Sequence, residues 1–169
     1  MADDAEKEKL DLLRGLTDQA FEDIKAEMKR LKLDRGKAAY RRPLDLLEEA
    51  YLAIRYPVAA KGGASLPLLA LRGAIDRSIE ELVRRSPAQQ KGEKRRDRVL
   101  SIGLHCGKKG LALAHFDSLA VEDESVNQEL AGKGSQTALE RPDLVKHFLR
   151  GAQFLRALLA SVDEALLPP

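Results

Sequence analysis

The sequence has one cysteine, no tryptophan and few aromatic residues of any kind. Of its 169 residues only 4% are aromatic, while 44% are hydrophobic, and most of the latter are Leu and Ala. Cys106 alone cannot form an intramolecular disulfide, which excludes a disulfide-stapled fold and indicates a reducing compartment, the cytoplasm. Because Leu and Ala are good helix formers and β-enriched residues are scarce, the composition favours an all-α protein.

The sequence also has no long apolar run and no strong charge of one sign. No stretch approaches the roughly 18 consecutive apolar residues that a membrane span requires, so no membrane partner is expected. The first residues, Met1 to Glu6, are acidic where a secretory signal needs a basic start and an apolar run. The net charge of +2 is too close to balance to predict nucleic-acid binding by itself.

Apolar residues recur at steps of three and four in two long segments. Residues 4–32 are predicted to form an amphipathic helix, and a second such helix runs from Val145 to Leu166. A helix of the first length would span roughly 40 Å, which is typical of a bundle or an oligomer interface. These apolar stripes are either consumed in the core or partly used to pair with another chain.

Shorter helices are predicted between the two long ones. One begins at Pro43 and ends at Pro57, one runs from Ser65 to Pro87, and two cover residues 93–106 and 111–131. Gly132 to Gly134 is expected to close the last of these, and residues 57–65 form a flexible linker. The sequence therefore predicts a single domain, residues 1–169, folded as a bundle of about five to six helices with long N- and C-terminal amphipathic helices.

The clearest charge asymmetry is a basic stretch around the fourth predicted helix. Its cations could neutralise phosphates of RNA or DNA, and a second basic connector around Tyr40 could add a stacking ring. A solvated surface and an acidic protein partner are the alternatives. The candidate nucleic-acid-binding residues are Arg84, Arg85, Lys91, Lys94, Arg95, Arg96, Lys108 and Lys109.

Arg98 and His105 lie seven residues apart in the same predicted helix, which puts them on nearly one face. An Arg, several residues and a His on a helix of a small all-α domain resembles the motif of the HEPN superfamily, many of whose members are metal-independent ribonucleases that act as dimers. The resemblance implies that Arg98 contacts the scissile phosphate and that His105 takes part in proton transfer, two catalytic roles. A similar spacing occurs at Arg141 and His147.

No pattern in the sequence indicates a metal site or a cofactor. Cys106 and His105 are adjacent and point about 100° apart on a helix, and no second cysteine exists to complete a ligand set. Cys106 is therefore expected to be a buried side chain that only fills space in the core.

The leading hypothesis is a non-enzymatic helical module that works through protein contacts, as a homo-oligomer or as a small subunit of a larger bacterial-type complex. The alternative is a HEPN-like domain that binds or cuts RNA without a metal, using Arg98 and His105.

Overall fold

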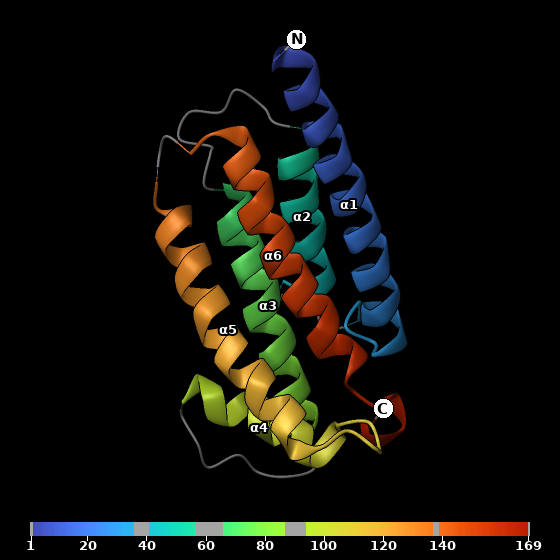
Figure 1. Cartoon of the computed structure of the whole chain (residues 1–169). Coiled ribbons are helices and arrows are strands. Elements are labelled where there is room, and N and C mark those ends of the chain that lie inside the picture. The colour runs from blue at the N-terminus through green and yellow to red at the C-terminus, as the bar shows by residue number, and fades with distance from the viewer. Residues whose placement is uncertain (1, 36–40, 57–65, 87–93, 137–138, 169) are drawn as a thin grey trace.

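The computed structural model describes residues 2–35, 41–56, 66–86, 94–136 and 139–168. Within these ranges every regular element is a helix apart from one isolated bridge, which confirms the all-α bundle (Figure 1). The predicted linker 57–65 lies outside the described residues. The helices are α1 (Ala2–Arg30), α2 (Pro43–Arg55), α3 (Leu66–Arg85), α4 (Arg95–Cys106), α5 (Leu113–Gly134), α6 (Arg141–Ala160) and the 3₁₀ helix η1 (Glu164–Leu166).

Helices α1 and α6 lie side by side and run in the same direction (Figure 1). Arg30, the last residue of α1, donates to two carbonyls at 2.9 Å each. One is that of Leu159 near the end of α6, and the other is that of Val162 just beyond α6. Helices α2 and α3 form an antiparallel pair, and α5 runs antiparallel to α3 and α6. We call the end where α1 and α6 begin the upper end. The lower end holds the last turns of α1 and α3 and the connection from α4 to α5.

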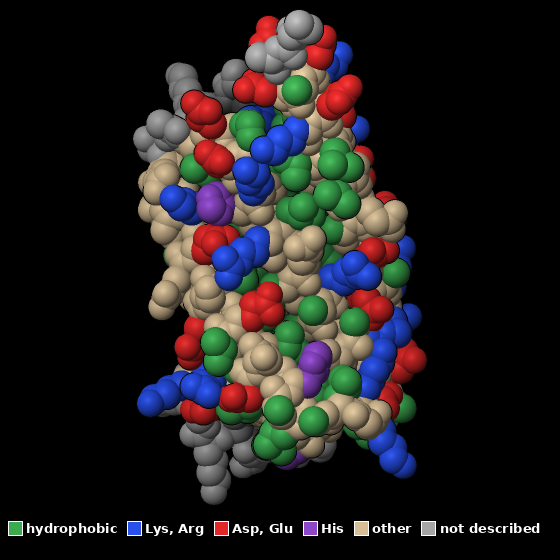
Figure 2. Space-filling model, viewed as in Figure 1, with side chains coloured by type: hydrophobic (Ala, Val, Ile, Leu, Met, Phe, Trp, Pro, Cys, Tyr) green, Lys and Arg blue, Asp and Glu red, His purple; other side chains and the backbone are tan. Residues whose placement is uncertain are grey.

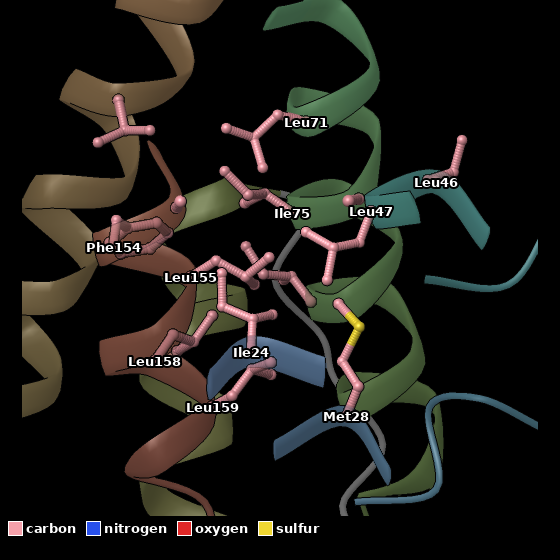
Figure 3. Packing of buried hydrophobic residues seen from close by; sticks show 14 of the residues in the cluster. Ile24, Met28, Leu46, Leu47, Leu71, Ile75, Phe154, Leu155, Leu158 and Leu159 are labelled. Carbon is pink, nitrogen blue, oxygen red and sulfur yellow. The ribbon is translucent and has the colours of Figure 1, made fainter. Parts of the chain in front are cut away.

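The core is a continuous cluster of aliphatic and Phe side chains between the helices. Figure 3 shows Ile24 and Met28 of α1 near Leu158 and Leu159 of α6, with Ile75 of α3 above them. All five side chains are buried. Full burial of a side chain of this size contributes about 1.5 to 3 kcal/mol, so this cluster holds α1, α3 and α6 together.

The prediction that the last helix continues to Leu166 is wrong. Helix α6 ends before it, and Leu166 lies in η1 with an exposed side chain. The backbone N–H of Asp163 donates to the Cys106 carbonyl and that of Lys108 to the Ser161 carbonyl, both at 2.8 Å. The chain leaves α6 because these bonds pair it with the segment that follows α4.

The fifth helix ends within the predicted segment Gly132 to Gly134, but at Gly134, three residues later than the predicted end at Ala131. A Cβ added at Gly134 would lie 2.8 Å from the Leu69 side chain of α3, whereas one at Gly132 would meet nothing within 4 Å. Gly134, the last residue of α5, therefore leaves room for the Leu69 side chain of α3.

Helix α1 ends in a Schellman motif with a lysine where glycine is usual. The N–H of Leu33 donates to the Met28 carbonyl at 2.8 Å and that of Lys32 to the Lys29 carbonyl at 3.2 Å. Lys32 consequently has a φ of 58°, the only positive φ outside glycine among the described residues. This left-handed conformation costs a residue with a Cβ about 1 kcal/mol or more. The fully buried Leu33 fixes the turn and holds Lys32 at the surface.

Candidate functional site

Helix α4 presents Arg98 and His105 on nearly one face. Val99, Ile102 and Cys106 form its buried side, as the sequence predicts. Arg98 is exposed and His105 is partly exposed. Seven residues of helix separate their Cα atoms by about 10 Å along the axis. One chain thus offers a single guanidinium and a single imidazole two turns apart, and a HEPN-type site would need a second copy to complete it.

The similar pair Arg141 and His147 serves two separate contacts. Arg141 donates to the backbone carbonyl of Ile54 at the end of α2. The Nδ1 atom of His147 lies 3.2 Å from a carboxylate oxygen of Glu129 on α5. Both residues hold neighbouring helices to α6, and their spacing does not bring them to a shared partner.

Arg95, a predicted nucleic-acid contact, joins three helices. Its Nε lies 2.5 Å and one terminal nitrogen 3.1 Å from the two carboxylate oxygens of Asp123 on α5, and it also pairs with Asp76 on α3. Asp123 has no solvent exposure. Burial raises the pKa of the Asp123 carboxyl, and the hydrogen bonds from Arg95 oppose that rise. The Arg95 guanidinium is therefore committed to the interior of the bundle.

The other predicted basic residues divide into three groups. Arg96 forms an ion pair with Asp117 at 2.7 Å. Arg84 and Arg85 line a cavity at the lower end of the bundle. Lys94, Lys108 and Lys109 are exposed, as are Arg84 and Arg96, and Lys91 lies outside the described residues. The stretch that is continuous in sequence is thus not one continuous basic surface.

Cys106 is buried, as the sequence predicts, and its thiol donates to the Ile102 carbonyl at 3.2 Å. Burial raises the pKa of the thiol to about 11. At neutral pH almost none of it is thiolate, which is the reactive form, so this cysteine is not poised as a nucleophile.

We expect Cys106 in the native protein to react with a disulfide reagent only as fast as the bundle opens. The measurement is the rate of thiol modification at pH 8 with and without guanidinium chloride. Rapid, complete modification of the folded protein would show that the thiol is accessible and contradict its placement in the core.

Two further kinds of site find no support in the described part of the chain. It contains no group of three or more His, Cys, Asp and Glu side chains arranged to hold a metal ion. None of its helices combines the length and apolar character needed to cross a membrane.

Three arginines from different helices meet at the upper end, and we call them the arginine cluster: Arg14 of α1, Arg55 of α2 and Arg141 of α6. They line a small cavity of about 10 Å³, room for about one water molecule. A carboxylate oxygen of Asp11 lies 3.8 Å from a terminal nitrogen of Arg14, and one of Asp18 lies 3.4 Å from the Nε of Arg55. Among the described residues, no carboxylate forms an ion pair with Arg141.

The arginine cluster has hydrogen-bonding capacity that the described chain does not use. The Nε atoms of Arg14 and Arg141 are buried and have no hydrogen-bond partner among the described residues. Burial lowers the pKa of Arg141, and the nearby Arg14 and Arg55 guanidinium groups lower it further. Buried donors and like charges in one place raise the free energy of the fold, and an anionic group would relieve both.

The first turns of α1 extend beyond the rest of the bundle at this same end (Figure 1), whereas Arg14 already lies beside α2 and α6. No residue described there is buried before Thr17. Leu12 is 65% and Leu16 44% exposed, whereas Leu10 and Leu13 pack partly against the core. We call residues 3–16 the projecting half of α1. Figure 2 shows acidic side chains on its first turns, hydrophobic side chains below them, and basic side chains where α6 begins.

The arginine cluster was not predicted from the sequence, because its members are far apart in the chain. One signal was present: Arg14 lies between Leu10 and Thr17 in the apolar stripe of the first predicted helix. A cation in such a row is costly to bury unless it meets a partner. The partner helices, however, are set by the tertiary fold.

Comparison of the chain with models of protein families, with curated proteins and with solved structures finds no match. The resemblance to the HEPN superfamily therefore rests on the helical architecture and the Arg98–His105 spacing alone.

Proposed function

We propose that this chain is a self-associating helical module that works through protein contacts, and that the projecting half of α1 pairs with the same segment of a second copy. The observation that carries the proposal is the exposure of Leu12 and Leu16 on a helix that extends past its own bundle.

The length of the projecting half supports a partner for it. Its 14 residues span about 21 Å, and of its leucines Leu10 and Leu13 pack partly against the core while Leu12 and Leu16 do not. Leu12 and Leu16 are separated by four residues and lie on one face. A helix from another chain would bury them and stabilise these turns.

The distribution of charge favours a second copy as the partner. The first turns of α1 carry four carboxylates, Asp3, Asp4, Glu6 and Glu8, against two cations, Lys7 and Lys9, while the arginine cluster lies at the base of the projecting half. In an antiparallel, two-fold arrangement the acidic turns of each copy come to lie against the arginine cluster of the other. Such a surface is self-complementary, as a two-fold interface requires.

The first test replaces both exposed leucines with lysine. We expect Leu12→Lys/Leu16→Lys to weaken self-association at least about 100-fold, because each copy loses two buried leucines. The melting temperature of the dissociated protein should not change, since neither side chain is in the core. Sedimentation equilibrium over a concentration series measures the association, and circular dichroism the fold.

The control is Leu104→Lys/Leu113→Lys at the lower end, where the two side chains are 63% and 54% exposed. This variant adds the same charge and removes the same apolar surface, and it should associate like the wild type. A wild type that stays monomeric at high concentration, or equal effects of the two variants, would overturn the proposal.

The HEPN-like alternative requires a different assembly. A catalytic dimer would bring α4 of two copies together, whereas the proposed pairing through the upper end keeps them apart. Purified protein incubated with RNA in EDTA distinguishes the two proposals. Metal-independent cleavage by the wild type that is lost in His105→Ala would favour the ribonuclease and contradict the module.

A further inference from the structure

A cavity of about 520 Å³ opens at the lower end, between the last residues of α1 and α3. This volume is within the usual range for small-molecule sites. Of the described residues, four cations and one carboxylate line it, and none of these lining side chains is aromatic. The lining residues are Lys32, Arg35, Glu81, Arg84, Arg85, Ser86 and Pro168. We call this space the basic cavity.

The positive charge of the cations that line the basic cavity is larger than the negative charge of the described groups around them. Arg84 donates to Glu81 at 2.5 and 3.1 Å, and Arg85 donates to the Leu31 carbonyl at 2.5 Å. The C-terminal ends of α1 and α3 each carry about half a negative charge. With Glu81 they offset about half of the four cations, so the cavity retains a positive potential.

The lysine on the rim occupies a conformation that glycine adopts more easily. Lys32 has a φ of 58° at the position where a Schellman motif favours glycine. This strained conformation places the side chain of Lys32, with its ammonium group, beside the cavity. Strained residues of this kind are concentrated at binding sites.

The cavity also contains a hydroxyl group without a partner. The Ser86 Oγ is buried and has no hydrogen bond within the described part of the chain. Buried polar atoms are usually paired, so an unpaired hydroxyl that lines a cavity is suited to donate to a bound group.

We propose that the basic cavity binds a small molecule or ion with two or three adjacent phosphate groups. Arg35, Arg84 and Lys32 would contact the phosphate oxygens, and Ser86 would donate its hydroxyl. Among the described lining residues no aromatic side chain offers a surface on which a nucleic-acid base could stack. Arg95 and Arg96, which would extend a basic track along α4, are held by Asp123 and Asp117. A compact polyphosphate therefore fits these observations better than RNA.

The test is isothermal titration of the full chain with inorganic triphosphate, pyrophosphate and orthophosphate at constant ionic strength. We expect triphosphate to bind at least about tenfold more tightly than orthophosphate, because it contacts more cations at once. Lys32→Gly should weaken triphosphate binding about tenfold while it raises the melting temperature by about 1 to 3 °C. Opposite effects on binding and stability separate a lost contact from a damaged fold.

Lys108→Gln removes an exposed lysine outside the cavity and should leave triphosphate affinity unchanged. Ser86→Ala should weaken binding without lowering the melting temperature. Equal affinities for the three phosphates, or equal effects of Lys32→Gly and Lys108→Gln, would overturn the proposal. So would tighter binding of a single-stranded RNA that is insensitive to Lys32→Gly. Because the basic cavity and the projecting half of α1 lie at opposite ends, either proposal can fail without the other.

Discussion

Replacement of Arg95 by alanine is expected to lower the free energy of unfolding by about 3 to 5 kcal/mol. The variant would leave the carboxylate of Asp123, which has no solvent exposure, without its cation. Asp123→Ala should cost less, because Arg95 keeps its contact with Asp76 on α3. Chemical denaturation of the two variants measures the difference.

The loss in Arg95→Ala should also depend on pH. Burial raises the pKa of Asp123, and the variant lacks the Arg95 hydrogen bonds that oppose this rise. When the pKa of Asp123 in the folded protein lies above its unfolded value of about 3.9, the free energy of unfolding falls as the pH rises from the unfolded pKa to the folded pKa. The gap between wild type and variant should therefore be smaller near pH 4 than at pH 7.

An apolar replacement of the whole pair provides the control. Arg95→Met/Asp123→Leu leaves no buried charge and should recover most of the stability that Arg95→Ala loses. A loss of less than about 1 kcal/mol in Arg95→Ala, the range of exposed pairs, would show that Arg95 is not committed to the interior. Arg95 would then become available again as a nucleic-acid contact.

Replacement of Gly103 by alanine is expected to destabilise the bundle by about 2 kcal/mol or more. A Cβ at Gly103 would lie 2.3 Å from Cγ of Phe116, and the Phe116 ring is buried with 1% exposure. Neither α4 nor the ring can move without disturbing the packing of α4 on α5. The clash should exceed the gain of about 1 kcal/mol that alanine brings to a helix.

Gly132→Ala in α5 is the matched control. A Cβ there meets nothing within 4 Å, so the same substitution should stabilise by up to about 1 kcal/mol. Thermal and chemical denaturation of both variants measure whether each substitution stabilises or destabilises the protein. Stabilisation by Gly103→Ala would show that α4 does not pack on Phe116 as described.

The helices were predictable because their apolar spacing is local information. Ile24, Met28 and Leu31 repeat at helical steps, and all three are buried. The end of α6 was not predictable, because Val162 continues the apolar spacing of the helix. Only the bridge between Val162 and Gly107 shows that the chain has left the helix there. Gly134 likewise resembles a helix stop in sequence, and its role depends on the neighbouring Leu69.

The candidate sites depend still more on tertiary structure. Arg84, Arg95 and Arg96 belong to one basic stretch in sequence, yet they face a cavity, the interior and Asp117 in the fold. Lys32 gave no signal, since the left-handed turn that holds it requires the burial of Leu33. Charge runs therefore identify a region to inspect, and the partners of each cation decide its role.

Hydrogen exchange along α1 at several protein concentrations tests the proposed self-association most directly. We expect amides of residues 5–16 to exchange more slowly as the protein concentration rises over about a hundredfold range, while those around Ile24 and Met28 stay protected throughout. Exchange in the projecting half that is rapid and independent of concentration would show that no second copy covers it, and would contradict the proposed function.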